Sequence, residues 1–190
     1  MTNKVLLDTN SYLRLARIFH PLLGEQPGKS QTRMCILAET IEELKNSPRL
    51  QSKFKWYNKP EFTENRKYTL SIPKKHRKNI EEIEEHLWEH KKDMGYNTSI
   101  ADVYMLACGS ILDITVITDD TDMISLAIEF DIKVHKTIEL LHFFVGDNVL
   151  EKEQIMEFIK EWIIFDDLPK NLVNDYKELF GENINIDDFT

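Results

Sequence analysis

The stretch Val116-Ile-Thr-Asp-Asp-Thr-Asp-Met123 marks the place around which the chain is organised. Residues 114–117 are β-branched and mostly apolar, which predicts a short buried strand. Hydroxyl and carboxylate side chains follow this strand directly, including Asp119, Asp120 and Asp122. In open α/β sheets, ligands bind at the carboxyl ends of the strands. The stretch therefore predicts a functional sheet edge, and the chemistry of its side chains suggests a metal site.

A second junction of the same kind opens the chain. The apolar residues Val5-Leu-Leu7 run straight into Asp8, and Asn10 follows two residues later. Strands that alternate with helices predict a parallel sheet covered by helices. The carboxyl ends of parallel strands meet at one edge, so we expect Asp8 and Asp120 to lie close together.

Apolar periodicity outlines the other elements. Helical spacing at Met34, Leu37, Ile41 and Leu44 predicts one helix over residues 32–46. Residues 48–75 lack a sustained period, which predicts short helices and loops. Further helices are expected over residues 10–20, 79–94, 99–111, 121–130, 137–145, 151–165 and 168–180, and a further strand over residues 132–135.

Size and composition favour a cytoplasmic protein. With 190 residues, 42% hydrophobic and 30% charged, the chain suits one soluble domain with an appendage. Its apolar runs fall far short of the roughly 18 residues that cross a membrane, and no secretory signal is visible. Cys35 and Cys108 lie in apolar helical patterns without metal-ligand spacing, so we expect buried thiols in a reducing compartment.

The net charge of −9 conceals two opposite segments. Residues 46–80 hold ten basic residues against two acids, a local charge of +8, and residues 147–190 hold twelve acids against four lysines, a local charge of −8. Basic residues interleaved with aromatic ones favour a nucleic-acid interface. A solvated surface whose aromatics pack into the core is an equally good interpretation. The strongest candidates for RNA contacts are Lys74, Lys75, Arg77 and Lys78.

The acidic C-terminal segment has two interpretations. It could lie near the basic segment and restrain it, because the two local charges match. It could instead add a helical layer that stabilises the core, which we favour slightly. The apolar residues that would form this layer are Ile155, Phe158, Ile159 and Trp162.

Two further acids stand in helices that are mostly apolar. Glu39 adjoins Ala38, and Asp102 lies among apolar neighbours. A buried carboxylate is costly unless it is paired or coordinates a metal. Each acid also has a simpler explanation: Asp8 and Asp120 can cap helices, Asp102 can form a capping box with Ser99, and Glu39 can be exposed.

Together these residues resemble the PIN domain family, and most closely the ribonuclease toxins of bacterial toxin–antitoxin systems. The resemblance covers about residues 3–145 and rests on Asp8-Thr-Asn10, Glu39, Asp102 and Thr118-Asp-Asp-Thr-Asp122. The sequence departs from the family pattern at Met123, where an aromatic residue is usual, and in its acidic extension.

The resemblance implies a three-layer α/β/α sandwich with a central parallel sheet over residues 1–146, followed by a helical extension over residues 147–190. It implies Mg²⁺- or Mn²⁺-dependent cleavage of RNA by a metal-activated water. Family motifs assign the catalytic acids Asp8, Glu39, Asp102, Asp120 and Asp122, with Asp8, Asp102 and Asp120 as metal ligands and Asn10 and Thr118 as supporting residues. The expected partners are RNA, an antitoxin protein and a second copy of the chain.

Other functions fit the sequence less well. A PIN fold that binds RNA or protein without cutting is the main alternative. A haloacid-type phosphatase would need a second Asp where this chain has Asn10. His86 and His90 have helical i, i+4 spacing, but no third zinc ligand or HExxH pattern accompanies them. We expect both to be exposed helix residues.

Overall fold

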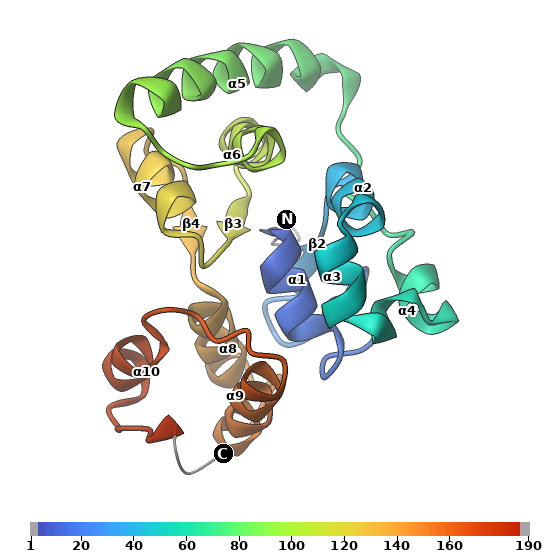
Figure 1. The fold of residues 1–190 in the computed structure, drawn as a ribbon, viewed down its shortest axis with the longest axis vertical. Helices are drawn as coiled ribbons and strands as arrows, with labels where there is room; N and C mark the ends of the chain where they lie inside the picture. Colours follow the sequence, from blue (N-terminus) through green and yellow to red (C-terminus); the bar gives the residue numbers. More distant parts are fainter. Residues whose placement is uncertain (1–3, 187–190) are drawn as a thin grey trace.

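Four short parallel strands form the centre of the computed structural model, which describes residues 4–186 (Figure 1). Their order is β2-β1-β3-β4. The strands are β1 (Lys4–Leu7), β2 (Arg33–Cys35), β3 (Thr115–Ile117) and β4 (Val134–His135). Because β1 pairs with β3 in register Leu7↔Ile117, the residues that follow these two strands emerge side by side. We call this side of the sheet the carboxyl edge.

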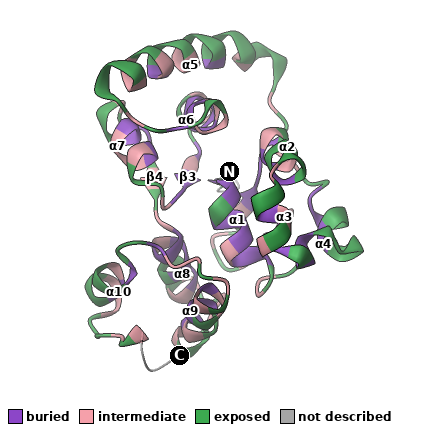
Figure 2. Ribbon diagram, viewed as in Figure 1, coloured by how far each residue is buried: buried purple, intermediate pink, exposed green. Residues whose placement is uncertain are grey.

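Helices cover both faces of the sheet, so the fold is a three-layer sandwich with a parallel centre. Val5, Leu7 and Ile117 point into a core shared with α1 (Thr9–Ala16), α8 (Thr137–Gly146) and α9 (Ile155–Ile164). Leu6 and Val116 point into a second core with α5 (Lys74–Met94), α6 (Ile100–Leu112) and α7 (Thr121–Glu129). Figure 2 shows buried residues on the inner faces of these helices and exposed residues outside.

One predicted helix is wrong. Residues 32–46 form strand β2 and then helix α2 (Ala38–Asn46). Met34 and Ile36 are buried in the first core, and Cys35 and Leu37 in the second. Alternate residues thus face opposite sides, which is the period of a strand that is buried on both faces. Cys35 therefore lies in a strand, although both cysteines are buried free thiols as expected.

The basic segment consists of short helices and connections, as predicted. These are α3 (Pro48–Lys53), η1 (Lys55–Asn58) and α4 (Pro60–Asn65), which precede α5. Four of its aromatic residues, Phe54, Trp56, Tyr57 and Phe62, are buried, and only Tyr68 is largely exposed. The aromatic side chains of this segment therefore serve mainly the core, and its charged side chains are what it offers to a partner.

The C-terminal layer comprises η2 (Lys152–Gln154), α9 and α10 (Leu172–Phe180). Its apolar residues Ile155, Phe158, Ile159 and Trp162 are at most 1% exposed and belong to the core that also holds Leu7. These contacts show that the segment packs against the core as a helical layer. The division at residues 146 and 147 stays a prediction, and residues 187–190 of the extension lie outside the described residues. Within residues 4–186, no helix is long and apolar enough to span a membrane.

Helix α6 approaches β3 closely at Gly109. A Cβ atom there would lie 2.6 Å from Val116 Cγ2 and 3.1 Å from the Ile114 carbonyl oxygen. We therefore expect Gly109→Ala to lower the free energy of unfolding by about 2 kcal/mol, because overpacking displaces β3. Gly146→Ala is the matched control, since a Cβ atom there meets nothing within 4 Å. Urea unfolding of both variants measures the difference, and equal stabilities would contradict the close approach.

Candidate functional site

Asp8 is the buried acid of the carboxyl edge. It caps α1, where its Oδ1 accepts a hydrogen bond from the Ser11 amide at 2.5 Å, and its Oδ2 accepts one from the Thr118 hydroxyl at 2.6 Å. The residue is only 4% exposed. Burial raises the pKa of Asp8 from its ordinary 3.8 to about 6, the two hydrogen bonds lower it, and the nearby charge of Asp119 raises it. Ionised Asp8 is therefore held at an energetic cost.

Thr118 connects Asp8 to Asp120. Its Oγ1 donates to Asp8 and accepts a hydrogen bond from the Asp120 amide at 3.1 Å. Asp120 is exposed and caps α7, and its Oδ1 accepts hydrogen bonds from the amides of Asp122 and Met123 at 2.9 and 2.8 Å. One buried threonine therefore links the Asp8 carboxylate to the Asp120 backbone amide, and a site shared by the two carboxylates stays a prediction. Asn10 is exposed on the first turn of α1.

Asp102 and Asp122 lie around the start of α6. The Ser99 amide donates to Asp102 Oδ2 at 2.8 Å, and the Asp102 amide donates to the Ser99 hydroxyl at 3.1 Å, which completes the capping box. Asp122 Oδ2 accepts a hydrogen bond from the Asn97 amide at 2.8 Å. The loop before α6 therefore brings these two acids to the same region, although each already has a structural role.

Glu39 faces α5 and α6. It is half-buried on the first turn of α2, and its charge contributes to raising the pKa values of Glu84 on α5 and of Tyr104 and Cys108 on α6. Burial is the larger cause for all three groups. Glu43, one helical turn further along α2, accepts a hydrogen bond from the Thr9 hydroxyl beside Asp8. The α2 acid that contacts the first turn of α1 is therefore Glu43. Its spacing of i+4 from Glu39 is the only feature of the sequence that could have predicted this contact.

The donor set of the carboxyl edge can be compared with what a metal ion requires. Among residues 4–186, no three His, Cys, Asp or Glu side chains are grouped so that they could hold a metal ion. Mg²⁺, however, commonly keeps several waters and binds through one or two carboxylates and substrate phosphates. Asp8 and Asp120 offer oxygen ligands of this kind at the ends of two paired strands. The roles of Asp102, Glu39 and Asp122 stay predictions.

A further cluster of charged side chains lies at the carboxyl edge, and no sequence pattern predicts it. Arg14 Nη1 contacts Asp119 Oδ2 at 2.6 Å, and Asp119 also accepts hydrogen bonds from the hydroxyl and the amide of Thr137 at 2.5 and 3.1 Å. Asp167, in the loop between α9 and α10, contacts Arg14 Nε at 3.0 Å. The chain positions of these residues are far apart, so only the folded structure brings them together.

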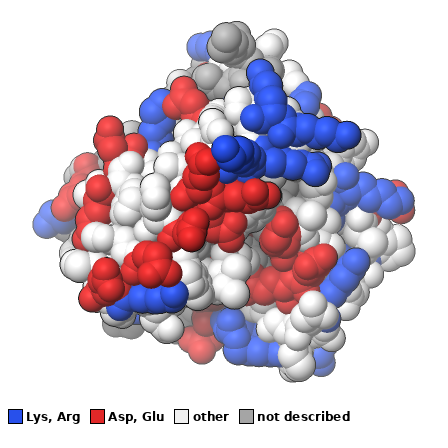
Figure 3. Space-filling view, turned by 90° about the horizontal axis from the view of Figure 1, so that it is seen from above, with Lys and Arg blue, Asp and Glu red and all other residues white. Residues whose placement is uncertain are grey.

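The predicted RNA-binding residues occupy the first turns of α5. Lys74, Lys75, Arg77 and Lys78 are all exposed, and Lys78 lies 3.4 Å from Glu82 in an exposed ion pair. Cations at a helix N-terminus oppose the helix dipole, so their placement gives α5 no stability. Seen from the side of α5, basic side chains gather next to a band of acidic ones (Figure 3).

His86 and His90, two of the three histidines of α5, belong to no group of three possible metal ligands among residues 4–186. His86 is exposed, whereas His90 is half-buried and contacts Glu129 on α7. Tyr96 donates to the same glutamate at 2.6 Å. These contacts attach the end of α5 to α7.

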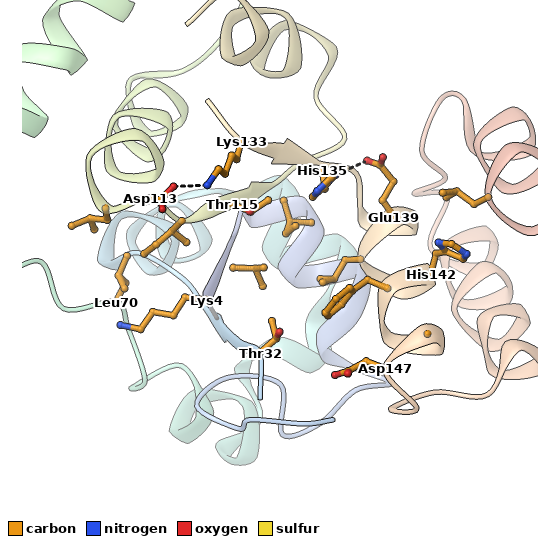
Figure 4. Close-up of a pocket in the computed structure, with 18 of the residues that line it drawn as sticks. Lys4, Thr32, Leu70, Asp113, Thr115, Lys133, His135, Glu139, His142 and Asp147 are labelled. Atoms are coloured by element: carbon orange, nitrogen blue, oxygen red, sulfur yellow. Dashed lines mark hydrogen bonds and ion pairs between the residues drawn. The ribbon is translucent and has the colours of Figure 1, made fainter. Parts of the chain in front are cut away.

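A cavity of about 1150 Å³ lies away from the candidate acids (Figure 4). Its lining includes Lys4, Val5 and Phe143, together with the ion pairs Lys133–Asp113 and His135–Glu139. None of the five predicted catalytic acids lines it. The cavity and the carboxyl edge are therefore separate features.

No family model matches the chain, and no curated protein matches its sequence. Among solved structures, the crystal structure of FitAcB from Neisseria gonorrhoeae is similar to it, with 19% sequence identity and a TM-score of 0.45. The similarity covers 70% of this chain and 97% of the other.

Proposed function

We propose that the protein is a Mg²⁺- or Mn²⁺-dependent endoribonuclease whose catalytic centre lies at the carboxyl edge. The observation that carries the proposal is the link from Asp8 through Thr118 to Asp120, at the ends of two paired parallel strands. A carboxylate that is buried at a cost, next to an exposed one, suits a site that receives a cation. The sequence resemblance to PIN-domain ribonuclease toxins points to the same chemistry.

In the proposed mechanism, Asp8 and Asp120 would hold the ion, and Thr118 orients the Asp8 carboxylate. The bound ion supplies Lewis-acid polarisation of the scissile phosphate and a water of lowered pKa. Thr118 holds Asp8 Oδ2 by its hydrogen bond, and the caps of α1 and α7 fix the backbone on both sides. The expected products carry 5′-phosphate and 3′-hydroxyl ends.

A protein that binds RNA or protein without cutting is the second candidate. The observation in its favour is that each of Asp8, Asp102, Asp120 and Asp122 already accepts a structural hydrogen bond. Incubating RNA with the protein, with Mn²⁺ or with EDTA, separates the two functions. Metal-dependent cleavage that is lost in Asp120→Asn supports the nuclease and excludes a contaminant, whereas binding without cleavage supports the second candidate.

The partners of the proposed nuclease follow from the same resemblance. A toxin of this class would be a cytoplasmic protein, neutralised by an antitoxin protein, and could act as a homodimer. Co-expression with the gene adjacent to its own, followed by purification of the complex and the RNA cleavage assay, tests the antitoxin proposal. A purified complex that cuts RNA as fast as the free protein would contradict neutralisation.

The start of α5 is expected to carry substrate affinity and not chemistry. Reversing Lys74, Lys75, Arg77 and Lys78 to Glu should weaken RNA binding and reduce the slope of log K against log salt by up to about 3, because each lost phosphate contact removes about 0.7. Reversing Lys170 and Lys177, which are exposed in the C-terminal layer, is the control. Titrations at several salt concentrations measure the slope, and an unchanged slope would show that α5 is only a solvated surface.

A further inference from the structure

Arg14 is held from two sides at the carboxyl edge. It lies on α1, with a side chain only 10% exposed. Its Nη1 contacts Asp119, and its Nε donates to both the carbonyl oxygen and Oδ2 of Asp167 at 3.0 Å. We call Asp119, Arg14 and Asp167 the Arg14 bridge. The guanidinium fork presents several donors in a fixed plane, so it can join two carboxylates in one geometry.

The bridge fixes Asp119 as a structural acid. Asp119 Oδ2 accepts from Arg14 and from the Thr137 hydroxyl, and Oδ1 accepts from the Thr137 amide. The Thr137 hydroxyl also lies 3.0 Å from the Ser11 hydroxyl, on the first turn of α1 after Asp8. Asp119 therefore does not compete with Asp8 and Asp120 for a cation, while its backbone connects Thr118 to Asp120.

The C-terminal layer holds the other end of the bridge. The segment that joins α9 to α10 runs beside α1 (Figure 1), where it supplies Asp167. Lys53 on α3 contacts Asp167 Oδ1 at 3.3 Å and the Asp166 carbonyl at 2.7 Å, so Asp167 has a second cation besides Arg14. In addition, the Trp162 indole donates to the backbone carbonyl of Arg14 at 3.0 Å. The layer thus holds residue 14 by both its backbone and its side chain.

We propose that the Arg14 bridge positions the residues of the candidate metal site, so that the C-terminal layer contributes to the function of the carboxyl edge. This inference rests on the proposed function. Arg14 is a positioning residue, because its bonded nitrogens already contact Asp119 and Asp167. Without the Asp167 contact, the guanidinium loses one of its two carboxylate partners and no longer sets the orientation of Asp119. The backbone of residues 118–120, which includes Asp119, is then no longer held in one position. Residues that support ligands in this way typically contribute about 10- to 100-fold to metal affinity or activity.

Asp167→Asn and Arg14→Lys test the proposal, with Asp166→Asn as the matched control. Asp166 is the neighbouring exposed acid, uses its backbone carbonyl to contact Lys53, and has a positive φ of 48° that Asn tolerates. Thermal melts in EDTA establish that each variant folds. The Mn²⁺-induced rise in Tm then measures metal binding, and kcat and KM for RNA are measured separately.

We expect Asp167→Asn and Arg14→Lys to require about 10-fold more Mn²⁺ for the same rise in Tm and to lower kcat about 10-fold, with KM for RNA nearly unchanged. Asp166→Asn should stay within about twofold of the wild type. Arg14→Lys keeps the charge but not the fork, so it reports on geometry even if Asp167→Asn does not fold. A folded Asp167→Asn or Arg14→Lys protein with wild-type Mn²⁺ response and kcat would overturn the proposal.

A failure of the proposed function and a failure of the Arg14 bridge proposal give different results. A wild-type protein that binds Mn²⁺ but leaves RNA intact contradicts the proposed function, and the Mn²⁺ response of the variants still decides the role of the bridge. A wild-type protein without any Mn²⁺ response and without cleavage overturns both. A wild type that cleaves RNA together with variants that cleave equally well overturns only the bridge.

Discussion

Replacing Asp8 by Asn is expected to abolish Mn²⁺-dependent RNA cleavage, a loss of at least about 100-fold, while stabilising the metal-free protein at neutral pH. The two effects have one cause. Asp8 is 4% exposed, and burial raises its pKa to about 6. The shift from the ordinary 3.8 corresponds to roughly 3 kcal/mol of unfavourable free energy at pH 7. Asn avoids this cost but loses one accepted hydrogen bond, so we expect a net gain of about 1–2 kcal/mol.

The pH dependence gives the sharper measurement. The pKa of Asp8 is higher in the folded than in the unfolded state, so its stabilising contribution is fully present below pH 3.8 and is lost as the pH rises through about 6. The stability difference between Asp8→Asn and the wild type should therefore be small below pH 3.8 and largest above pH 6. Urea unfolding in EDTA across this range measures it.

Asp131→Asn is the control for this series, because Asp131 is exposed and its positive φ of 54° suits Asn. As an exposed substitution, it should change stability by no more than about 0.5 kcal/mol. A flat profile for Asp8→Asn would show that the buried carboxylate is not costly. The cost falls on Asp8 and not on Asp120, whose exposed position and capping bonds give no reason to expect a gain from Asp120→Asn.

Ending the chain after Asn148 is expected to prevent folding. The cut removes Ile155, Phe158, Ile159 and Trp162, which are at most 1% exposed. At about 1.5–3 kcal/mol for each buried side chain, the loss is roughly 6–12 kcal/mol, comparable with the entire stability of a typical domain. The cut also exposes the apolar face of α1, against which α9 packs, and that of α8, against which α10 packs.

Solubility and circular dichroism of the shortened chain measure this effect. A chain ending at Ile186 is the control, because it keeps every described residue. A soluble chain ending at Asn148 that melts cooperatively and cuts RNA faster than the full chain would instead favour a C-terminal segment that restrains the basic segment.

The sequence predicts those parts of the fold in which the hydrophobic period and the position of the polar residues indicate the same element. The two junctions at Asp8 and Asp120 are visible because an apolar strand changes abruptly to carboxylates. Strand β2 is not visible in this way. Met34 and Cys35 are buried on opposite faces of the strand, and a run such as Met34 to Leu37 fits a helix equally well. Only its pairing with β1 settles the choice.

The candidate site, too, could be predicted from the sequence only in part. For Asp8 and Asp120, the helix-capping interpretation is right, and capping uses one carboxylate oxygen in each case; their role as metal ligands stays a prediction. The cost of ionising Asp8 depends on burial, which spacing alone does not reveal. The Arg14 bridge joins residues separated by 105 and 153 positions, and neither separation leaves a local pattern.

Trp162 is an intrinsic fluorescence probe of the C-terminal layer. Its indole is 1% exposed and donates to the Arg14 carbonyl, so its fluorescence should be blue-shifted while α9 is docked. Undocking would place the ring in water and shift its emission to the red. Trp56 and Trp88 lie outside the C-terminal layer. A protein in which both are replaced by Phe would therefore report, in real time and without RNA, when the layer leaves the carboxyl edge.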